Sequence, residues 1–194
     1  MSTGEGFWAF SVRIYGKPDV PSACLALQNE YGLDVNLLLY CCWLGTHGAQ
    51  LDSAALARAL ELAGPWAEHV VQPLRHARTW MKHDSDARGQ LPADVYAELR
   101  ESIKTIELEA ERLEQLTLEA ITTHSILRPV SKDEAASCTS TNLLLYTSEA
   151  GITLDAEMRV HLATILSAVT DTEHAQLAEY PGAHRKESTM SNDG

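Results

Sequence analysis

The pentapeptide NLLLY occurs at residues 36–40 and again at residues 142–146. The match extends further, because NLLLYCCWLGTHGAQLDSAALARAL aligns with NLLLYTSEAGITLDAEMRVHLATIL with a gap of three residues in the connecting loop. Both segments read as helix, glycine-containing turn, Leu-Asp cap and helix, which is an αα-hairpin. We expect two similar hairpins to pack together and form the interior, with Asn36 and Asn142 starting equivalent helices. A coincidence between leucine-rich helices is the alternative, because leucine is a favourable helix residue.

Helix signals dominate the rest of the chain, and glycine and proline mark the helix ends. Asp34, Asp52 and the Ser131/Glu134 pair are typical N-terminal caps. Gly64-Pro65 predicts the end of one helix, and Pro73 predicts a kink or a break in the next. Helices are expected at residues 7–15, 21–29, 35–45, 53–63, 65–83, 93–127, 132–149 and 156–169. The sequence thus predicts an all-α single domain over residues 1–170, a bundle of about seven helices with two similar hairpins around one long central helix. A polar, disordered tail is expected at 171–194.

The long helix has an apolar stripe with helical spacing, and a row of acids lies beside it. The acids are Glu107, Glu111 and Glu114. The stripe consists of Leu99, Ile103, Ile106, Ala110, Leu113 and Ala120.

Composition narrows the class of protein. The 194 residues carry a formal charge of −12, which argues against a protein that mainly binds nucleic acid. The longest apolar stretch is about eight residues, whereas a membrane span needs roughly 20. The N-terminus lacks the pattern of a signal peptide, and the four cysteines form no CxxC pair. We expect a cytoplasmic protein with reduced, buried thiols and no metal or cofactor.

The N-terminal part contains the motifs FWxFS (7–11), CLxLQ (24–28) and GxDVNLLL (32–39). In this order they resemble the opening of a bacterial family of conserved hypothetical proteins, a domain of unknown function. The similarity continues through WAEHVVQPLRHARTWMK and IELEAERLEQLTLEA. The resemblance implies an all-helical fold in a bacterium and brings no catalytic residue with it.

Three cations form the most prominent charged feature. Arg75, Arg78 and Lys82 share one face of a helix, opposite a stripe expected to face the core. That stripe consists of Trp66, Val70, Ala77, Trp80 and Met81. The cations could bind a phosphate or an acidic peptide. Alternatively they form an ordinary solvated face, or they pair with the acidic row of an antiparallel neighbouring helix.

Catalytic motifs are absent from the sequence: there is no GxSxG elbow, no glycine-rich phosphate loop and no HExxH. An aromatic cluster near the N-terminus (Phe7, Trp8, Phe10 and Tyr15, with Tyr40 and Trp43) is either core or a partly exposed groove for a partner helix or an apolar ligand.

These observations favour a non-enzymatic protein-interaction module, with a protein partner or as a homodimer. Binding is expected through Arg75, Arg78 and Lys82, or through the aromatic surface near Trp8. The alternative is a small-molecule binding protein or enzyme with a pocket between the two hairpins. That pocket would be lined by Asn36, Tyr40, Trp43, His47, Asn142 and Tyr146.

Overall fold

A computed structural model of the chain describes residues 5–83, 89–122, 127–172 and 177. The regular elements within these ranges are all helical, as predicted. They are α1 (Phe7–Tyr15), α2 (Val20–Tyr31), α3 (Val35–Thr46), α4 (Ser53–Trp66), the π-helix η1 (Ala67–Val71), α5 (Gln72–His83), α6 (Ala93–Ala120), α7 (Lys132–Glu149) and α8 (Ala156–Thr170). Because α4, η1 and α5 follow without a break, the described residues form seven continuous helical rods. Most of the predicted tail lies outside the described residues.

The predicted caps are present. Each accepts a hydrogen bond from a backbone N–H in the first turn of its helix, which satisfies a group that has no partner within the helix. The donors are Asn36 and Leu37 for Asp34, Ala55 for Asp52 and Glu134 for Ser131. Asp155 caps α8 in the same way, through the N–H of Met158.

The predicted helix end at Gly64-Pro65 is wrong. The helix continues through Pro65 and then widens into η1, where the N–H of Gln72 donates to the carbonyl of Ala67, five residues earlier. Pro65 and Pro73 each lack one donor for the α-helical ladder, and the π-turn lies between them. The break predicted at Pro73 is absent, because α5 runs through Pro73; the backbone changes from π- to α-helical geometry just before it.

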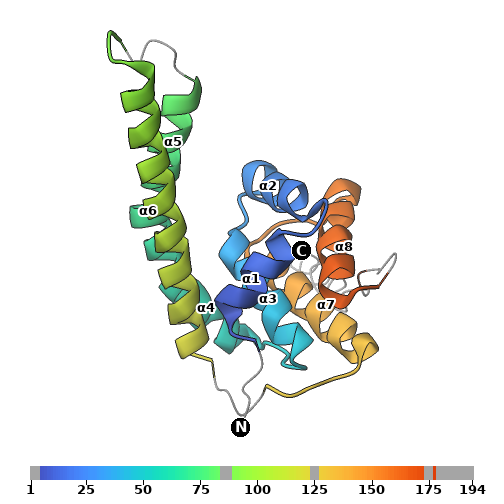
Figure 1. The fold of residues 1–194 in the computed structure, drawn as a ribbon. Helices are drawn as coiled ribbons and strands as arrows, with labels where there is room; N and C mark the ends of the chain where they lie inside the picture. The colour runs from blue at the N-terminus through green and yellow to red at the C-terminus, as the bar shows by residue number, and fades with distance from the viewer. Residues whose placement is uncertain (1–4, 84–88, 123–126, 173–176, 178–194) are drawn as a thin grey trace, which may run out of the picture.

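The centre of the molecule is an antiparallel contact between α3 and α7 (Figure 1). Asp34, which caps the start of α3, donates its N–H to the Tyr146 hydroxyl near the end of α7 at 2.9 Å. Gly45, near the end of α3, lies against the backbone of Thr139, and a Cβ at Gly45 would be 2.5 Å from its N and Cα atoms. Residues 36–45 are all buried, so α3 is covered on every side.

The two hairpins exist, α3 with α4 and α7 with α8, but their first helices are not equivalent. Asn36 lies in the first turn of α3, whereas Asn142 is the eleventh residue of α7. The prediction that both asparagines start helices is therefore wrong for Asn142. Its amide instead bonds the turn of the other hairpin, donating to the carbonyls of Cys41 and Ala49 and accepting from the N–H of Leu51.

The long helix α6 is not central, contrary to the prediction. It pairs with α5, and this two-helix arm projects from the body formed by the other helices (Figure 1). The end of α6 anchors the arm to the body, because the Glu119 carboxylate accepts the N–H of Phe7 at 3.1 Å and so caps α1. The opposite end of the arm extends away from the body.

Candidate interaction surface

The contact between α5 and α6, which we call the inner seam of the arm, is polar. Arg75 of α5 donates to Glu107 (3.1 Å) and Glu111 (2.6 Å) of α6, and also to Gln28 of α2 (2.6 Å). Arg78 donates to both carboxylate oxygens of Glu107, from Nε at 2.5 Å and from Nη2 at 3.0 Å. For Arg75 and Arg78 the structure shows the alternative in which the basic face pairs with the acidic row of the neighbouring helix, through Glu107 and Glu111.

These pairs hold α5 and α6 in one register. Burial alone would raise the pKa of Glu107, but the hydrogen bonds from Arg78 and Arg75 outweigh burial and lower that pKa. Glu107 is therefore an anion held by two guanidinium groups, and breaking either contact would leave a buried charge poorly compensated. Lys82, the third cation, is exposed at the far end of α5.

The same polar side of α6 meets the body at Asn36. The Asn36 amide donates to Glu114 at 2.9 Å and accepts from Gln115 at 2.7 Å. Burial, reinforced by the nearby Asp34 carboxylate, raises the pKa of Glu114 to about 8. Asn36 thus joins α3 to α6 through side chains, unlike Asn142, which bonds backbone groups.

The apolar side of α6 faces solvent. Val95, Leu99, Ile106 and Leu113 are 52, 56, 56 and 42% exposed, and their spacing of four, seven and seven residues places them on one side of the helix. We call these four residues the outer stripe. Ile103, another large member of the predicted stripe, is partly buried. The arginine–glutamate seam occupies the face of α6 turned to α5, so Leu99, Ile106 and Leu113 remain exposed. Ala110 alone of the predicted stripe is buried.

The core-facing stripe predicted on α5 is also partly wrong. Met81 is buried, but Trp80 is 57% exposed and Ala77 is exposed. Trp66 lies closer to the seam, where its indole N–H donates to the carbonyl of Ala110 at 3.0 Å. The arm therefore presents exposed apolar groups on both of its helices.

The predicted aromatic cluster is core at its centre. Phe7 stacks on Trp43 with ring centroids 5.4 Å apart, and Tyr40 and His47 pack beside Trp43. The indole N–H of Trp43 donates to the carbonyl of Glu5. Trp8, on the outer side of α1, is partly exposed.

The side chains predicted to line a pocket between the hairpins are engaged within the protein. The Tyr40 hydroxyl bonds Thr122 at 2.8 Å, and the Tyr146 hydroxyl accepts the N–H of Asp34. His47 uses Nδ1 on the carbonyl of Trp43 at 2.8 Å. Tyr40, Tyr146, Asn36 and Asn142 thus bond separate parts of the fold to one another, whereas the His47 bond lies within the end of α3.

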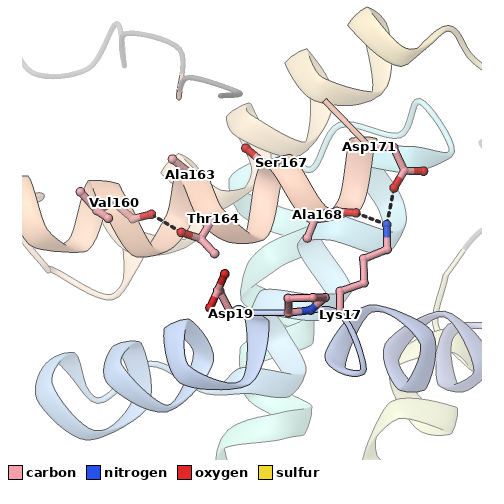
Figure 2. Close-up of a pocket in the computed structure, with 9 residues that line it drawn as sticks. Lys17, Asp19, Val160, Ala163, Thr164, Ser167, Ala168 and Asp171 are labelled. Atoms are coloured by element: carbon pink, nitrogen blue, oxygen red, sulfur yellow. Dashed lines mark hydrogen bonds and ion pairs between the residues drawn. The ribbon is translucent and has the colours of Figure 1, made fainter. Parts of the chain in front are cut away.

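A shallow groove of about 530 Å³ lies elsewhere, between the α1–α2 turn and α8 (Figure 2). Lys17 forms an ion pair with Asp171 and also donates to the carbonyl of Ala168 at 2.6 Å, and Asp19 adds a second carboxylate to the lining. The α8 wall consists mainly of small and aliphatic side chains, with the Thr164 hydroxyl bonded to the Val160 carbonyl.

Within the described residues, no cluster of His, Cys, Asp or Glu has the arrangement of a metal site. In that same part of the chain, no helix is long and apolar enough to cross a membrane.

A model of one protein family matches residues 6–118, more than half of the chain. The chain belongs to the DUF2390 family. DUF2390 is described as a protein of unknown function, which confirms the predicted membership of an uncharacterised family. The DUF2390 match covers α1 to most of α6, including the outer stripe, and ends before α7. Neither the curated proteins nor the solved structures gave a significant match.

Proposed function

We propose that the chain is a non-enzymatic protein-interaction module that binds its partner through the outer stripe of α6. The observation that carries this proposal is the exposure of Leu99, Ile106 and Leu113, three large aliphatic residues seven positions apart on a projecting helix. Monomeric soluble proteins rarely expose large contiguous apolar patches, and those that do commonly use them for binding. A repeat of seven residues is the spacing with which one helix packs along another.

The charged seam supports the proposal in a second way. Arg75 and Arg78 bind the glutamates of α6, so in this proposal they stiffen the arm and do not capture the partner themselves. A rigid arm loses less conformational entropy on binding than a flexible one. The aromatic surface near Trp8 and the exposed Lys82 have no role in the proposal.

The alternative, a ligand pocket between the hairpins, has less support. Asn36, Asn142 and Tyr146 use their polar atoms to bond neighbouring helices. For the setting, we propose the cytoplasm of a bacterium. The resemblance noted in the sequence supports the bacterial origin, and four buried, unpaired cysteines are typical of a reducing compartment.

The proposal is tested by placing a photo-crosslinking amino acid at Ile106 in the native cell. Val160 on α8, which is 63% exposed, is the matched control site. We expect protein adducts from position 106 that are absent or far weaker from position 160. Equal adduct yields at both sites, or none at either, would contradict an interaction through the outer stripe.

A further inference from the structure

We infer that the partner on the outer stripe is a second copy of this chain, with the two α6 helices packed antiparallel about a twofold axis near Ile106. This inference rests on the proposed function and specifies its partner. It is carried by the spacing of the stripe, by the charges beside it and by the position of the arm.

The stripe is nearly symmetric about its centre. Leu99 lies seven residues before Ile106, and Leu113 lies seven residues after it. In an antiparallel pair centred on Ile106, the two Ile106 side chains meet, and each Leu99 meets Leu113 of the second copy. Such a contact is self-complementary, which is the property that a twofold interface requires.

The flanking charges fit the same arrangement. Glu98 and Arg112 lie seven residues before and after Thr105, on the line of residues next to the stripe. In the antiparallel pairing centred on Ile106, Glu98 and Arg112 of the second copy lie two residues, about 3 Å along the helix axis, from the same level. Both side chains are long enough to span this offset, and the same holds for Arg112 and that copy's Glu98. Within one chain Arg112 already bonds Glu109 at 2.6 and 2.8 Å, so the interface would extend an existing ion pair.

The position of the arm also favours the antiparallel orientation. The body contacts the C-terminal half of α6, through Asn36 and Phe7, and the other half extends away from it (Figure 1). Antiparallel packing therefore places the two bodies at opposite ends of the pair.

The test is a charge exchange in the full-length chain, read by sedimentation equilibrium and native mass spectrometry. We expect wild type to be a dimer. Glu98→Arg and Arg112→Glu should each weaken self-association at least about tenfold, because each variant sets like charges opposite each other twice per dimer. An equimolar mixture of the two variants should restore the dimer as a heterodimer, since every pair is then complementary. Circular dichroism melts establish that both variants are folded.

Ile106→Glu should give a monomer, and the matched Val160→Glu change on α8 should not. A wild-type monomer at the highest concentration reached, or a mixture no tighter than its components, would overturn the inference. If wild type is monomeric while position 106 crosslinks to a different protein, the second copy is wrong as partner and the interaction surface stands. If position 106 also yields no adduct above position 160, both proposals fail.

Discussion

Glu114 is the residue whose burial has the clearest physical consequence. It is 1% exposed on the side of α6 that faces the body, and one carboxylate oxygen accepts the amide of Asn36. Within the described residues the other oxygen, Oε1, has no hydrogen-bond partner. A carboxylate in this position is costly, whereas a protonated carboxyl group is not. The raised pKa of about 8 follows from this burial.

The raised pKa predicts a particular pH dependence. An unfolded glutamate has a pKa of about 4.3, so between about pH 4.3 and about pH 8 the folded state binds a proton that the unfolded state releases. The contribution of Glu114 to stability is thus fully present below about pH 4.3 and is lost as the pH rises through about 8. Glu114→Gln keeps the shape without the charge. We expect the variant to match wild type near about pH 5 and to exceed it by a few kcal/mol near about pH 9.

Urea denaturation at the two pH values measures this difference. Glu109→Gln is the control, because Glu109 is exposed beside Arg112 and its pKa is lowered, so no comparable change between these pH values is expected. If the free energies of unfolding of wild type and Glu114→Gln differ by the same amount at both pH values, Glu114 is not the titrating group.

The caps and the inter-helix contacts show which features could be read from the sequence at the level of elements. Asp34, Asp52, Ser131 and Asp155 act through neighbouring backbone groups, so a short sequence window was enough to predict them. The helix end at Gly64-Pro65 was mispredicted because packing of the continuous rod overrides local propensity. A π-turn has no comparable signature in the sequence.

The orientation of α6 shows where reading the sequence failed and how it could have succeeded. Apolar periodicity indicates one side of a helix but does not say what covers that side. Pairing of the acidic row with the basic face of α5 was one of the alternatives that the charge pattern left open, and Glu107 and Glu111 form it. Since Glu107 and Glu114 lie on a different side of the helix from Leu99, Ile106 and Leu113, that pairing already turned the stripe away from α5. The exposure of the stripe was therefore implicit in the charge pattern.

The contact between α3 and α7 yields a prediction at the same scale. Gly45→Ala would place a Cβ 2.5 Å from the backbone of Thr139, where no side chain can move aside. We expect a loss of about 1–3 kcal/mol or more, measured by chemical denaturation, because the two helices must separate. Gly64→Ala is the control inside α4, because apart from its chain neighbours and its own helix no atom lies within 4 Å of the added Cβ. It should change the stability by less than about 1 kcal/mol, because the better helix propensity of alanine is opposed by the contact of its Cβ with the ring of Pro65. Similar effects at both glycines would mean that α3 and α7 are not in close contact.

At the scale of the whole molecule, the family match covers only part of the residues that form the core. The match ends at residue 118, whereas the central contact joins α3 to α7, which begins at Lys132. Asn142 bonds three backbone groups in and after α3, and these would lose their partner without α7. The matched region therefore lacks one side of its own core.

A chain ending at residue 130 should accordingly fail to fold cooperatively. Residues 36–45 are buried on all sides, and removal of α7 and α8 would expose a large part of their apolar surface. We expect no sharp thermal transition and strong binding of a hydrophobic dye, measured by circular dichroism and fluorescence. A chain ending after residue 177, which keeps α7 and α8, is the control and should melt like the full-length protein. A cooperative melt and dispersed NMR resonances for the shorter chain would show that the matched region folds alone and that α3 gains its stability elsewhere.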